Sequence, residues 1–236
     1  MDPLTIIPVA GIPEVGPGDT LATLIVDAAS AQDTPVAEHD CVVVTQKVVS
    51  KAENRLVPLD PDDLAARRAL VESESVRVLR RRGDLIISET RHGFVCANAG
   101  VDLSNVADGF AALLPLDADR SARRIRDGIR ARAGVDVGVV VSDTFGRAWR
   151  TGLTDVAIGV AGIAGVVDLR GERDANGREL HVTEVAVADE IASAAELVMG
   201  KAKRVAAAIV RGLDPSWLRD GSVRELVRHP SEDLFR

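Results

Sequence analysis

The chain has 236 residues, enough to bury a substantial core in one large domain or two closely packed subdomains. Its hydrophobic fraction of 46% predicts a globular protein, and its net charge of −7 without a persistently basic segment argues against nucleic-acid binding. No apolar run approaches a membrane span, and the N-terminus does not resemble a secretory signal. We therefore expect a cytoplasmic protein that does not bind membranes.

The first half of the chain alternates short apolar runs with charged segments. Residues 6–9, 40–45 and 85–89 predict strands, and residues 20–31 have the spacing of a helix capped by Asp19 or Thr20. Residues 62–82 mix charged and apolar positions, which we interpret as one or two amphipathic helices. The loop at residues 11–14, GIPE, is either an ordinary turn or a receptor for a nucleotide base.

The second half contains further helix and strand signals. Residues 121–133 predict a basic helix, residues 156–167 suit a buried sheet or helix, and residues 174–177, DANG, predict a hairpin turn. Residues 184–198 have helical periodicity, and Gly200 can close that helix. Residues 206–212 predict a last core strand, and the segment from residue 214 is a polar tail.

Cys41 and Cys96 both lie in apolar segments, which favours reduced core thiols over a disulfide or a zinc site. None of the four histidines stands at metal-ligand spacing, and His92 is expected to be structural or solvated. The sequence also lacks a P-loop, a strand-coupled GxGxxG, a serine nucleophile elbow and an HExxH motif. A nucleotide would have to bind by another route.

The most informative stretch is residues 138–155, GVVVSDTFGRAWRTGLTD. Its valines predict a buried strand that ends at Asp143 and Thr144, which places polar side chains at the carboxyl edge of a sheet. A carboxylate and a hydroxyl there can bind divalent cations or a phosphate oxygen. Gly146 leaves room for a ligand, and Arg147 and Arg150 offer donors to phosphate or carboxylate. The alternative is a strand followed by a polar turn with solvated arginines.

Two other segments carry chemistry of the same kind. Residues 46–51, QKVVSK, suit a phosphate-contacting segment through Lys47 and Lys51, although solvent-facing lysines at a strand edge are an equally good interpretation. Asp102 follows a glycine-containing stretch and precedes Ser104 and Asn105. A carboxylate followed by an amide in such a loop either binds metal and phosphate together or forms an Asx turn.

Taken in order, residues 11–14, 45–51, 100–105 and 142–150 resemble the coenzyme F420-0:L-glutamate ligase family. Residues 183–190 and 199–201 are similar too, and the resemblance extends to about residue 213. It implies GTP-dependent addition of one or several γ-linked L-glutamates to the deazaflavin precursor coenzyme F420-0. We expect an acyl-phosphate intermediate, with release of GDP and phosphate.

The resemblance also implies site residues. The guanine nucleotide would be bound by Ile12, Pro13, Glu14, Val15, Gln46, Lys51, Asn105, Met199, Gly200, Lys201 and Ala202. Two divalent cations, Mg²⁺ or Mn²⁺, would be held by Asp102, Asp143 and Thr144, with K⁺ as a further ion. We expect Asp143, Lys51 and Arg147 to act in catalysis, Arg147 being inferred from its residue type alone. Gln46 departs from the small hydroxyl residue, and Leu169 from the aromatic residue, that the family often carries.

Short strands mixed with helices, without a regular βα repeat, favour an α+β fold of mixed sheets with two interleaved subdomains. We expect a ligase domain over residues 1–213, with a subdomain split near residues 85 and 190, and a C-terminal tail over residues 214–236. The resemblance implies an intertwined homodimer.

Two other functions stay open at this stage. A nucleotide- or deazaflavin-binding module without catalysis is favoured by Gln46 and Leu169 and opposed by the presence of Asp102, Asp143 and Thr144 together. A metal-dependent nucleotide phosphohydrolase would not need glutamate. Glutamate dependence therefore separates the ligase from the hydrolase.

Overall fold

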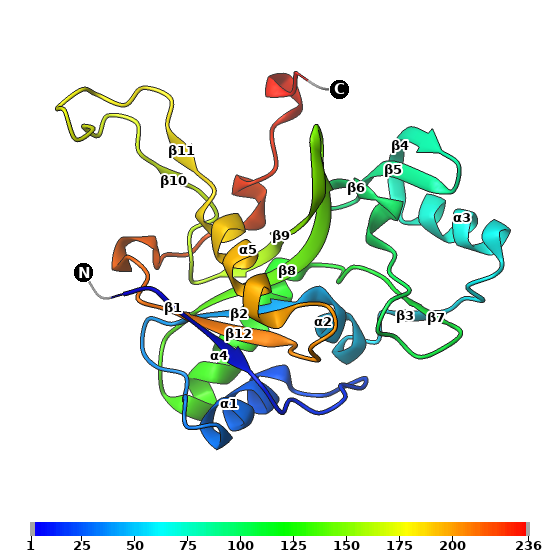
Figure 1. Ribbon diagram of the computed structural model, residues 1–236, viewed down its shortest axis with the longest axis horizontal. Coiled ribbons are helices and arrows are strands. Elements are labelled where there is room, and N and C mark those ends of the chain that lie inside the picture. The colour runs from blue at the N-terminus through cyan, green and yellow to red at the C-terminus, as the bar shows by residue number, and fades with distance from the viewer. Residues whose placement is uncertain (1–2, 235–236) are drawn as a thin grey trace.

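The computed structural model describes residues 3–234, which form an α+β fold with mixed sheets (Figure 1). The central sheet has five strands in the order β1-β12-β2-β8-β9. These are β1 (Thr5–Val9), β2 (Cys41–Thr45), β8 (Gly138–Arg147), β9 (Arg150–Ala161) and β12 (Ala207–Arg211). β2 and β8 run parallel, and the other neighbouring pairs are antiparallel. The predicted α+β class is confirmed, and the homodimer stays a prediction.

Helices cover both faces of this sheet because its central strands are apolar on both sides. The even-numbered valines of β2 and the odd-numbered valines of β8 pack with α1 (Leu21–Ala31) and α4 (Ala118–Ala133). Val43 and Val140 pack instead with α5 (Val187–Met199). The predicted helices over residues 20–31, 121–133 and 184–198 are thus confirmed, with shifted ends.

α1 and α4 approach each other closely because α4 carries Gly128 at their contact. A β-carbon at Gly128 would lie 2.6 Å from that of Ala22 in α1. α4 begins after Asp117, whose side chain accepts the N–H of Arg120 at 2.9 Å. It ends at Gly134, which has a φ of 72°, a conformation that favours glycine. The ends of this helix therefore follow from its own sequence.

An outer lobe lies beside the central sheet and is built from residues 56–112 (Figure 1). It contains β3 (Leu56–Pro58), α3 (Leu64–Ser73), β4 (Ser75–Arg82), β5 (Leu85–Thr90), β6 (Val95–Ala97), η1 (Asn98–Gly100) and β7 (Phe110–Ala112). The prediction of helices over residues 62–82 is wrong in its second half, because Ser75–Arg82 pairs with β5. The β-branched Val76 and Val78 favour this strand.

Two further segments project from or cover the body. β10 (Val167–Asp168) and β11 (Glu184–Val185) form the base of a long hairpin that extends away from the sheet (Figure 1). Its turn at residues 174–177 is confirmed, since Gly177 N donates to Asp174 O at 2.9 Å. The C-terminal segment has three short 3₁₀ helices, η2 (Pro215–Trp217), η3 (Val223–Glu225) and η4 (Pro230–Glu232). Trp217 and Leu226 pack against the core, so part of the predicted tail belongs to the body.

Cys41 and Cys96 are both free and buried, as predicted. Burial, with a smaller effect from the charge of Asp143, raises the pKa of Cys96 to about 12, so this thiol is protonated at neutral pH. Within residues 3–234, no helix is long and apolar enough to cross a membrane.

Candidate active site

A pocket of about 810 Å³ opens at the carboxyl end of β2, beside the middle of β8. Its walls come from the loop after β1, the start of α2 (Gln46–Ala52), the loop over residues 102–107, the strands β8 and β9, and the turn after α5. Residues 46–51, predicted to contact phosphate, lie in the helix α2, which follows β2 directly. The structure brings together at this pocket Ile12, Pro13, Glu14, Val15, Gln46, Lys51, Asp102, Asn105, Asp143, Thr144, Gly200, Lys201 and Ala202.

The position of Asp143 and Thr144 follows from the lengths of the two parallel strands. β2 ends at Thr45, which pairs with Ser142, while β8 continues to Arg147. The prediction that the strand ends at Asp143 is wrong, because β9 continues to supply an antiparallel partner beyond the end of β2. Asp143 and Thr144 nevertheless lie beyond the carboxyl end of β2, where ligands commonly bind in sheets with parallel strands.

Asp143 and Thr144 point to opposite faces of β8, because side chains alternate along a strand. Asp143 continues the odd-numbered series of Val141 and Phe145, which belongs to the α1–α4 side of the core. Thr144 lies on the α5 side and pairs with Asp155 of β9. One strand therefore presents a side-chain oxygen on each of its two faces.

On the first face, Asp143 shares the pocket with Asp102. Burial, together with the charges of Asp102 and Asp155, raises the pKa of Asp143 to about 7. The N–H of Thr144 and the ammonium group of Lys201 act in the opposite direction. Carboxylates that repel one another in a shared pocket favour a bound cation.

Asp102 is held by an Asx turn, one of the two structures expected from its sequence context. Its Oδ1 accepts hydrogen bonds from N and Oγ of Ser104 at 2.7 and 2.8 Å, and its Oδ2 lies 2.9 Å from Lys47 Nζ. Burial alone would raise the pKa of Asp102, but the Ser104 N–H and the Lys47 ammonium group lower it overall. Lys47 thus already places one positive charge beside this carboxylate.

The side chains expected to contact the nucleotide differ widely in exposure. Lys51 is 8% exposed and its Nζ contacts the carboxylate of Glu14, whose side chain is 84% exposed. A buried ammonium group paired with an exposed carboxylate can exchange that partner for a phosphate. Asn105 Nδ2 donates to Lys201 O at 3.2 Å, which links the loop over residues 102–107 to the turn after α5.

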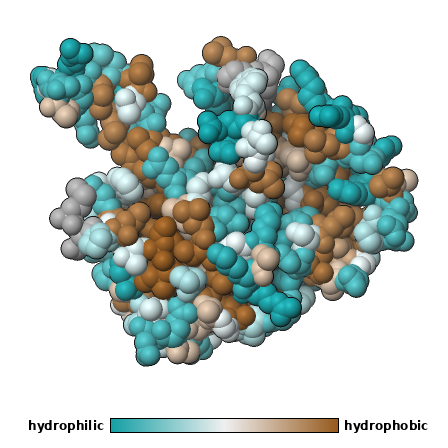
Figure 2. All heavy atoms as spheres, in the orientation of Figure 1, coloured by the Kyte–Doolittle hydropathy of each residue, from teal (hydrophilic) through white to brown (hydrophobic). Residues whose placement is uncertain are grey.

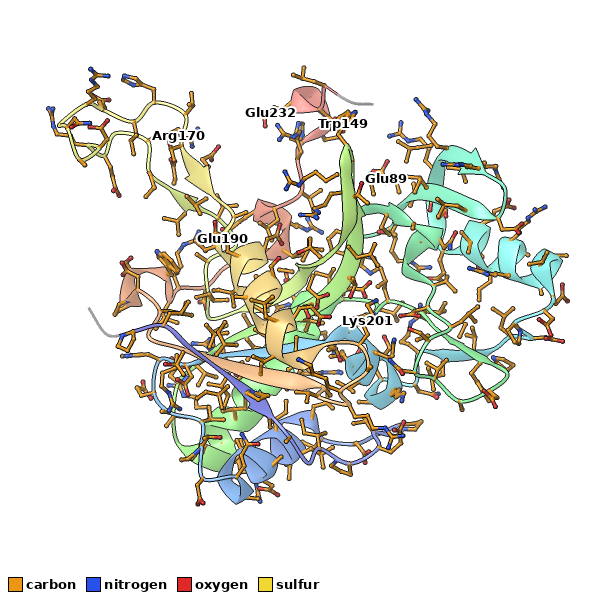
Figure 3. The ribbon with its side chains drawn as sticks, viewed as in Figure 1. Glu89, Trp149, Arg170, Glu190, Lys201 and Glu232 are labelled. Carbon is orange, nitrogen blue, oxygen red and sulfur yellow. The ribbon has the colours of Figure 1, made fainter. Side chains whose placement is uncertain are left out.

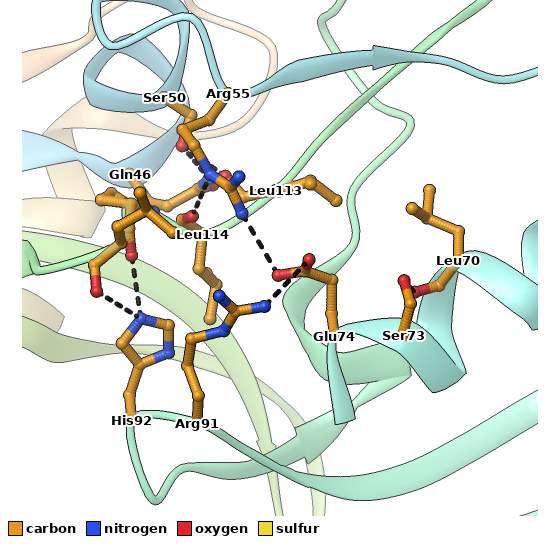
Figure 4. Close-up of polar contacts among 12 residues, drawn as sticks. Gln46, Ser50, Arg55, Leu70, Ser73, Glu74, Arg91, His92, Leu113 and Leu114 are labelled. Carbon is orange, nitrogen blue, oxygen red and sulfur yellow. Dashed lines mark hydrogen bonds and ion pairs between the residues drawn. The ribbon is translucent and has the colours of Figure 1, made fainter. Parts of the chain in front are cut away.

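Gln46 is buried in the pocket wall, with 1% of its surface exposed. Its Nε2 donates to Leu113 O at 3.0 Å and to Ser50 Oγ at 2.6 Å (Figure 4). Its Oε1 has no hydrogen-bond partner within the described residues. Gln46 thus keeps one buried acceptor for a donor group, although it is larger than a small hydroxyl residue.

Two predicted site residues lie outside the pocket lining. Met199 is fully buried at the end of α5 and packs in the core, so its side chain does not face the pocket. Arg147 is exposed near the tip of the β8–β9 hairpin, which extends beyond the pocket and carries Trp149 at its end (Figure 3). The roles expected of these two residues stay predictions.

Asp155 and Glu196 line the pocket but were not predicted. Asp155 is 2% exposed, and the signal that could have revealed it is an acidic residue directly before the apolar run over residues 156–161. Burial, followed by the charge of Asp155, raises the pKa of Glu196. Nothing in the helical pattern of α5 distinguishes Glu196 from its exposed neighbour Glu190.

The donor set fits a hard divalent cation only in part. The carboxylates of Asp102 and Asp143 and the hydroxyl of Thr144 are oxygen ligands of the kind that Mg²⁺ and Mn²⁺ prefer. Within residues 3–234, however, no three His, Cys, Asp or Glu side chains come together as a metal site. A cation here needs further ligands, such as phosphate oxygens.

Comparison with known proteins adds independent information. The sequence model of the family described as F420-0:Gamma-glutamyl ligase matches residues 11–212. The coenzyme F420:L-glutamate ligase of Methanothermobacter thermautotrophicus is 45% identical over 249 residues, covering 99% of each chain. That of Methanopyrus kandleri is 44% identical over 241 residues, covering 94% of each chain. That of Methanococcus maripaludis is 39% identical over 216 residues, covering 86% of this chain and 87% of the relative.

Proposed function

The chain belongs to the F420-0:gamma-glutamyl ligase family, and we propose that its pocket joins L-glutamate to F420-0 with GTP as the energy source. It is a ligase of coenzyme F420 biosynthesis that adds glutamate to F420-0. The nucleotide, the metal ions and the roles of individual residues are the proposed part.

In the proposed reaction, a carboxylate oxygen of F420-0 attacks the γ-phosphorus of GTP, and the bond to the β–γ bridging oxygen breaks. This step gives an acyl phosphate and GDP. The amino group of glutamate then attacks the acyl carbon, loses a proton, and displaces inorganic phosphate to leave an amide. All three substrates are anionic, so the pocket must neutralise charge for them to meet.

Asp102 and Asp143 would hold one divalent cation on one face of β8, and Thr144 would help to hold a second on the other face. Such ions, when bound, neutralise phosphate charge and align the reacting groups. Lys51 would turn from Glu14 to a phosphate oxygen. Gln46, Asn105 and the turn at residues 200–202 would bind the rest of the nucleotide, together with the loop at residues 12–15.

The observation that carries this proposal is the convergence of Asp102 and Asp143 in one pocket. The two carboxylates come from different segments, and the charge of Asp102 contributes to raising the pKa of Asp143. Two carboxylates that repel each other in a pocket destabilise the folded protein, and a cation bound between them would offset that cost. The surrounding lysines and the nearby loop backbone suit the anionic phosphates of a nucleotide bound with that cation.

We also propose a homodimer. Apolar side chains gather on the face that carries α5 and the base of the β10–β11 hairpin (Figure 2). Leu197 of α5 is 75% exposed, and Val182 before β11 is 85% exposed. Large apolar side chains of this kind support a protein–protein contact.

The reaction is tested by mass spectrometry of F420-0 after incubation with the protein, GTP, Mn²⁺ and L-glutamate, with each component omitted in turn. We expect glutamyl-extended product only when all components are present, and its mass gives the length of the tail. Loss of GTP without extension would instead indicate a phosphohydrolase. Extension that proceeds equally well without GTP or without metal would contradict the proposed chemistry.

A further inference from the structure

Asp155 is a buried carboxylate in the pocket for which the reaction above gives no role. It is 2% exposed and lies on β9 directly opposite Thr144. Its Oδ2 accepts a hydrogen bond from Ser142 Oγ at 2.8 Å, and its Oδ1 accepts one from Thr144 Oγ1 at 2.6 Å. Within residues 3–234, Asp155 forms no salt bridge, and its side chain accepts its hydrogen bonds from these two hydroxyl groups.

The direction of the hydrogen bond from Thr144 matters. A carboxylate can only accept, so the hydroxyl hydrogen of Thr144 must point at Asp155. The lone pairs of Thr144 Oγ1 are then directed away from Asp155, and Thr144 itself lines the pocket. An oxygen in this state is a ligand for a cation and not a donor to a phosphate oxygen.

The fold holds this pair in place from two sides. The register of β8 and β9 sets Thr144 opposite Asp155. Directly opposite residues project from the same face of a sheet, so their side chains are close enough to form a hydrogen bond. From α5, Ser193 Oγ donates to Asp155 O at 2.7 Å and lies 2.9 Å from Thr154 Oγ1. The backbone of Asp155 is therefore fixed between the sheet and the helix.

The electrostatic environment on this face of β8 also favours a cation. Glu196 lies one helical turn beyond Ser193 and lines the same pocket. Lys201 and Lys203 act on Glu196 from the turn after α5 and offset part of the negative charge. A buried carboxylate without a cationic partner is unfavourable, and a bound divalent ion would relieve that cost.

We propose that Asp155 is a positioning residue for the second divalent cation, acting by holding the hydroxyl of Thr144 with its lone pairs toward the pocket. The proposal rests on the proposed function, in which Thr144 helps to hold that ion beside the nucleotide. Asp155 then acts through Thr144 and also supplies long-range negative charge. Neither role requires Asp155 to touch the ion.

The test is a titration with Mn²⁺, followed by electron paramagnetic resonance of the free ion, in the presence of a non-hydrolysable GTP analogue. It compares the unmodified protein with Asp155→Ala, which removes the acceptor of the Thr144 hydroxyl, with Thr144→Val and with the double variant. We expect the unmodified protein to bind two Mn²⁺ per chain. Each single variant should bind the second ion roughly tenfold or more weakly, with the first ion and the analogue bound normally.

The double variant separates positioning from an independent effect. If Asp155 acts mainly through Thr144, the double variant should be little weaker than the weaker single variant, because both changes remove the same ligand. Thr144→Ser keeps the hydroxyl and should retain the second ion. Asp189→Ala is the matched control, since Asp189 is a half-buried carboxylate of α5 that accepts the N–H of Ala157 at 2.9 Å and does not line the pocket.

Normal binding of the second Mn²⁺ by a folded Asp155→Ala variant, with loss in Thr144→Val, would overturn the inference and leave the proposed function standing. Fully additive losses would also overturn it. Absence of Mn²⁺ binding by the unmodified protein would refute both. If Asp155→Ala does not fold, Asp155→Glu replaces it, because the longer side chain displaces the acceptor from Thr144 and should weaken the same site.

Discussion

At the scale of single residues, the pocket is built from groups that are unfavourable in the absence of ligand. Asp143 is the clearest example, because its carboxylate is affected by burial and by the charges of Asp102 and Asp155. Lys51 is buried beside an exposed carboxylate, and the buried Oε1 of Gln46 has no hydrogen-bond partner in the part of the chain that the structure describes. Such features are expected where binding energy from a ligand compensates for lost stability.

Asp143→Asn tests this compensation. Without divalent ions, we expect the variant to melt at a higher temperature than the unmodified protein, by about 2–4 °C for each kcal/mol of relieved repulsion. Its turnover should fall about a hundredfold or more, because an electrostatic contribution to the transition state is lost. Differential scanning calorimetry, with and without Mn²⁺, and a turnover assay check both results. A folded variant with unchanged turnover would remove Asp143 from the metal site.

His92 provides a second test at this scale, through the pH dependence of stability. Its Nε2 lies 2.9 Å from Pro115 O and 3.2 Å from Leu116 O (Figure 4), and the ring stacks on Phe94. Nε2 must carry the hydrogen, because both partners are acceptors. Burial lowers the pKa of His92 below 6.5 despite these hydrogen bonds. The folded protein therefore holds this ring neutral.

Below about pH 6.5 the unfolded chain binds a proton at His92 before the folded chain does, so acidification should reduce stability. The loss should begin near this value and level off below the folded pKa. We expect the urea midpoint of the unmodified protein to fall more between pH 7.5 and pH 5.5 than that of His92→Gln, which keeps an N–H donor. Equal changes in the two proteins would show that His92 does not contribute.

At the scale of elements, the sequence predicted the central strands well and the outer lobe poorly. The valine runs of β2 and β8 favour buried strands, and Gly200 closes α5 as predicted. Residues 75–82 lack such a run and form a strand only because β5 lies beside them. The length of β8 likewise depends on β9, which no local pattern specifies.

The contact between α1 and α4 gives a prediction for these elements. Gly128→Ala should lower the free energy of unfolding, even though alanine is favoured over glycine in a helix by about 1 kcal/mol. The reason is the new β-carbon, which would lie 2.6 Å from that of Ala22. Overpacking of this kind typically costs about 1–3 kcal/mol. Urea unfolding measures the net change.

The matched background is Ala22→Gly, which removes the opposing β-carbon. In that background Gly128→Ala should be neutral or stabilising, because only the helix preference remains. If Gly128→Ala destabilises both backgrounds equally, the close approach of α1 and α4 is not the cause.

At the scale of the whole molecule, the site combines segments that are far apart in the chain. The family resemblance predicted pocket residues such as Asp102, Asp143 and Lys201, because each of them lies in a short motif that is contiguous in the sequence. It did not identify Asp155, whose role follows from the strand register and from its contact with Thr144. Arg147 was predicted from its residue type and its closeness to Asp143 in the sequence. It lies near the tip of the β8–β9 hairpin, outside the pocket lining.

The homodimer belongs to the same scale. We expect light scattering coupled to size-exclusion chromatography to give twice the mass of one chain. Leu197→Glu should shift the protein toward the monomer, because it places a charge in the exposed apolar face of α5. Glu190→Gln, at another exposed position of α5, serves as the control. A monomer at micromolar concentration in the unmodified protein would contradict this assignment.

The central claim, that the pocket activates F420-0 as an acyl phosphate, is tested most directly with ¹⁸O in the reacting carboxylate of F420-0. Phosphate released during glutamate addition would be analysed by ³¹P nuclear magnetic resonance for the isotope shift. Because attack through a carboxylate oxygen leaves that oxygen on phosphorus, we expect one labelled oxygen in each phosphate when both carboxylate oxygens carry ¹⁸O. Glutamyl product formed with unlabelled phosphate would contradict the acyl-phosphate route.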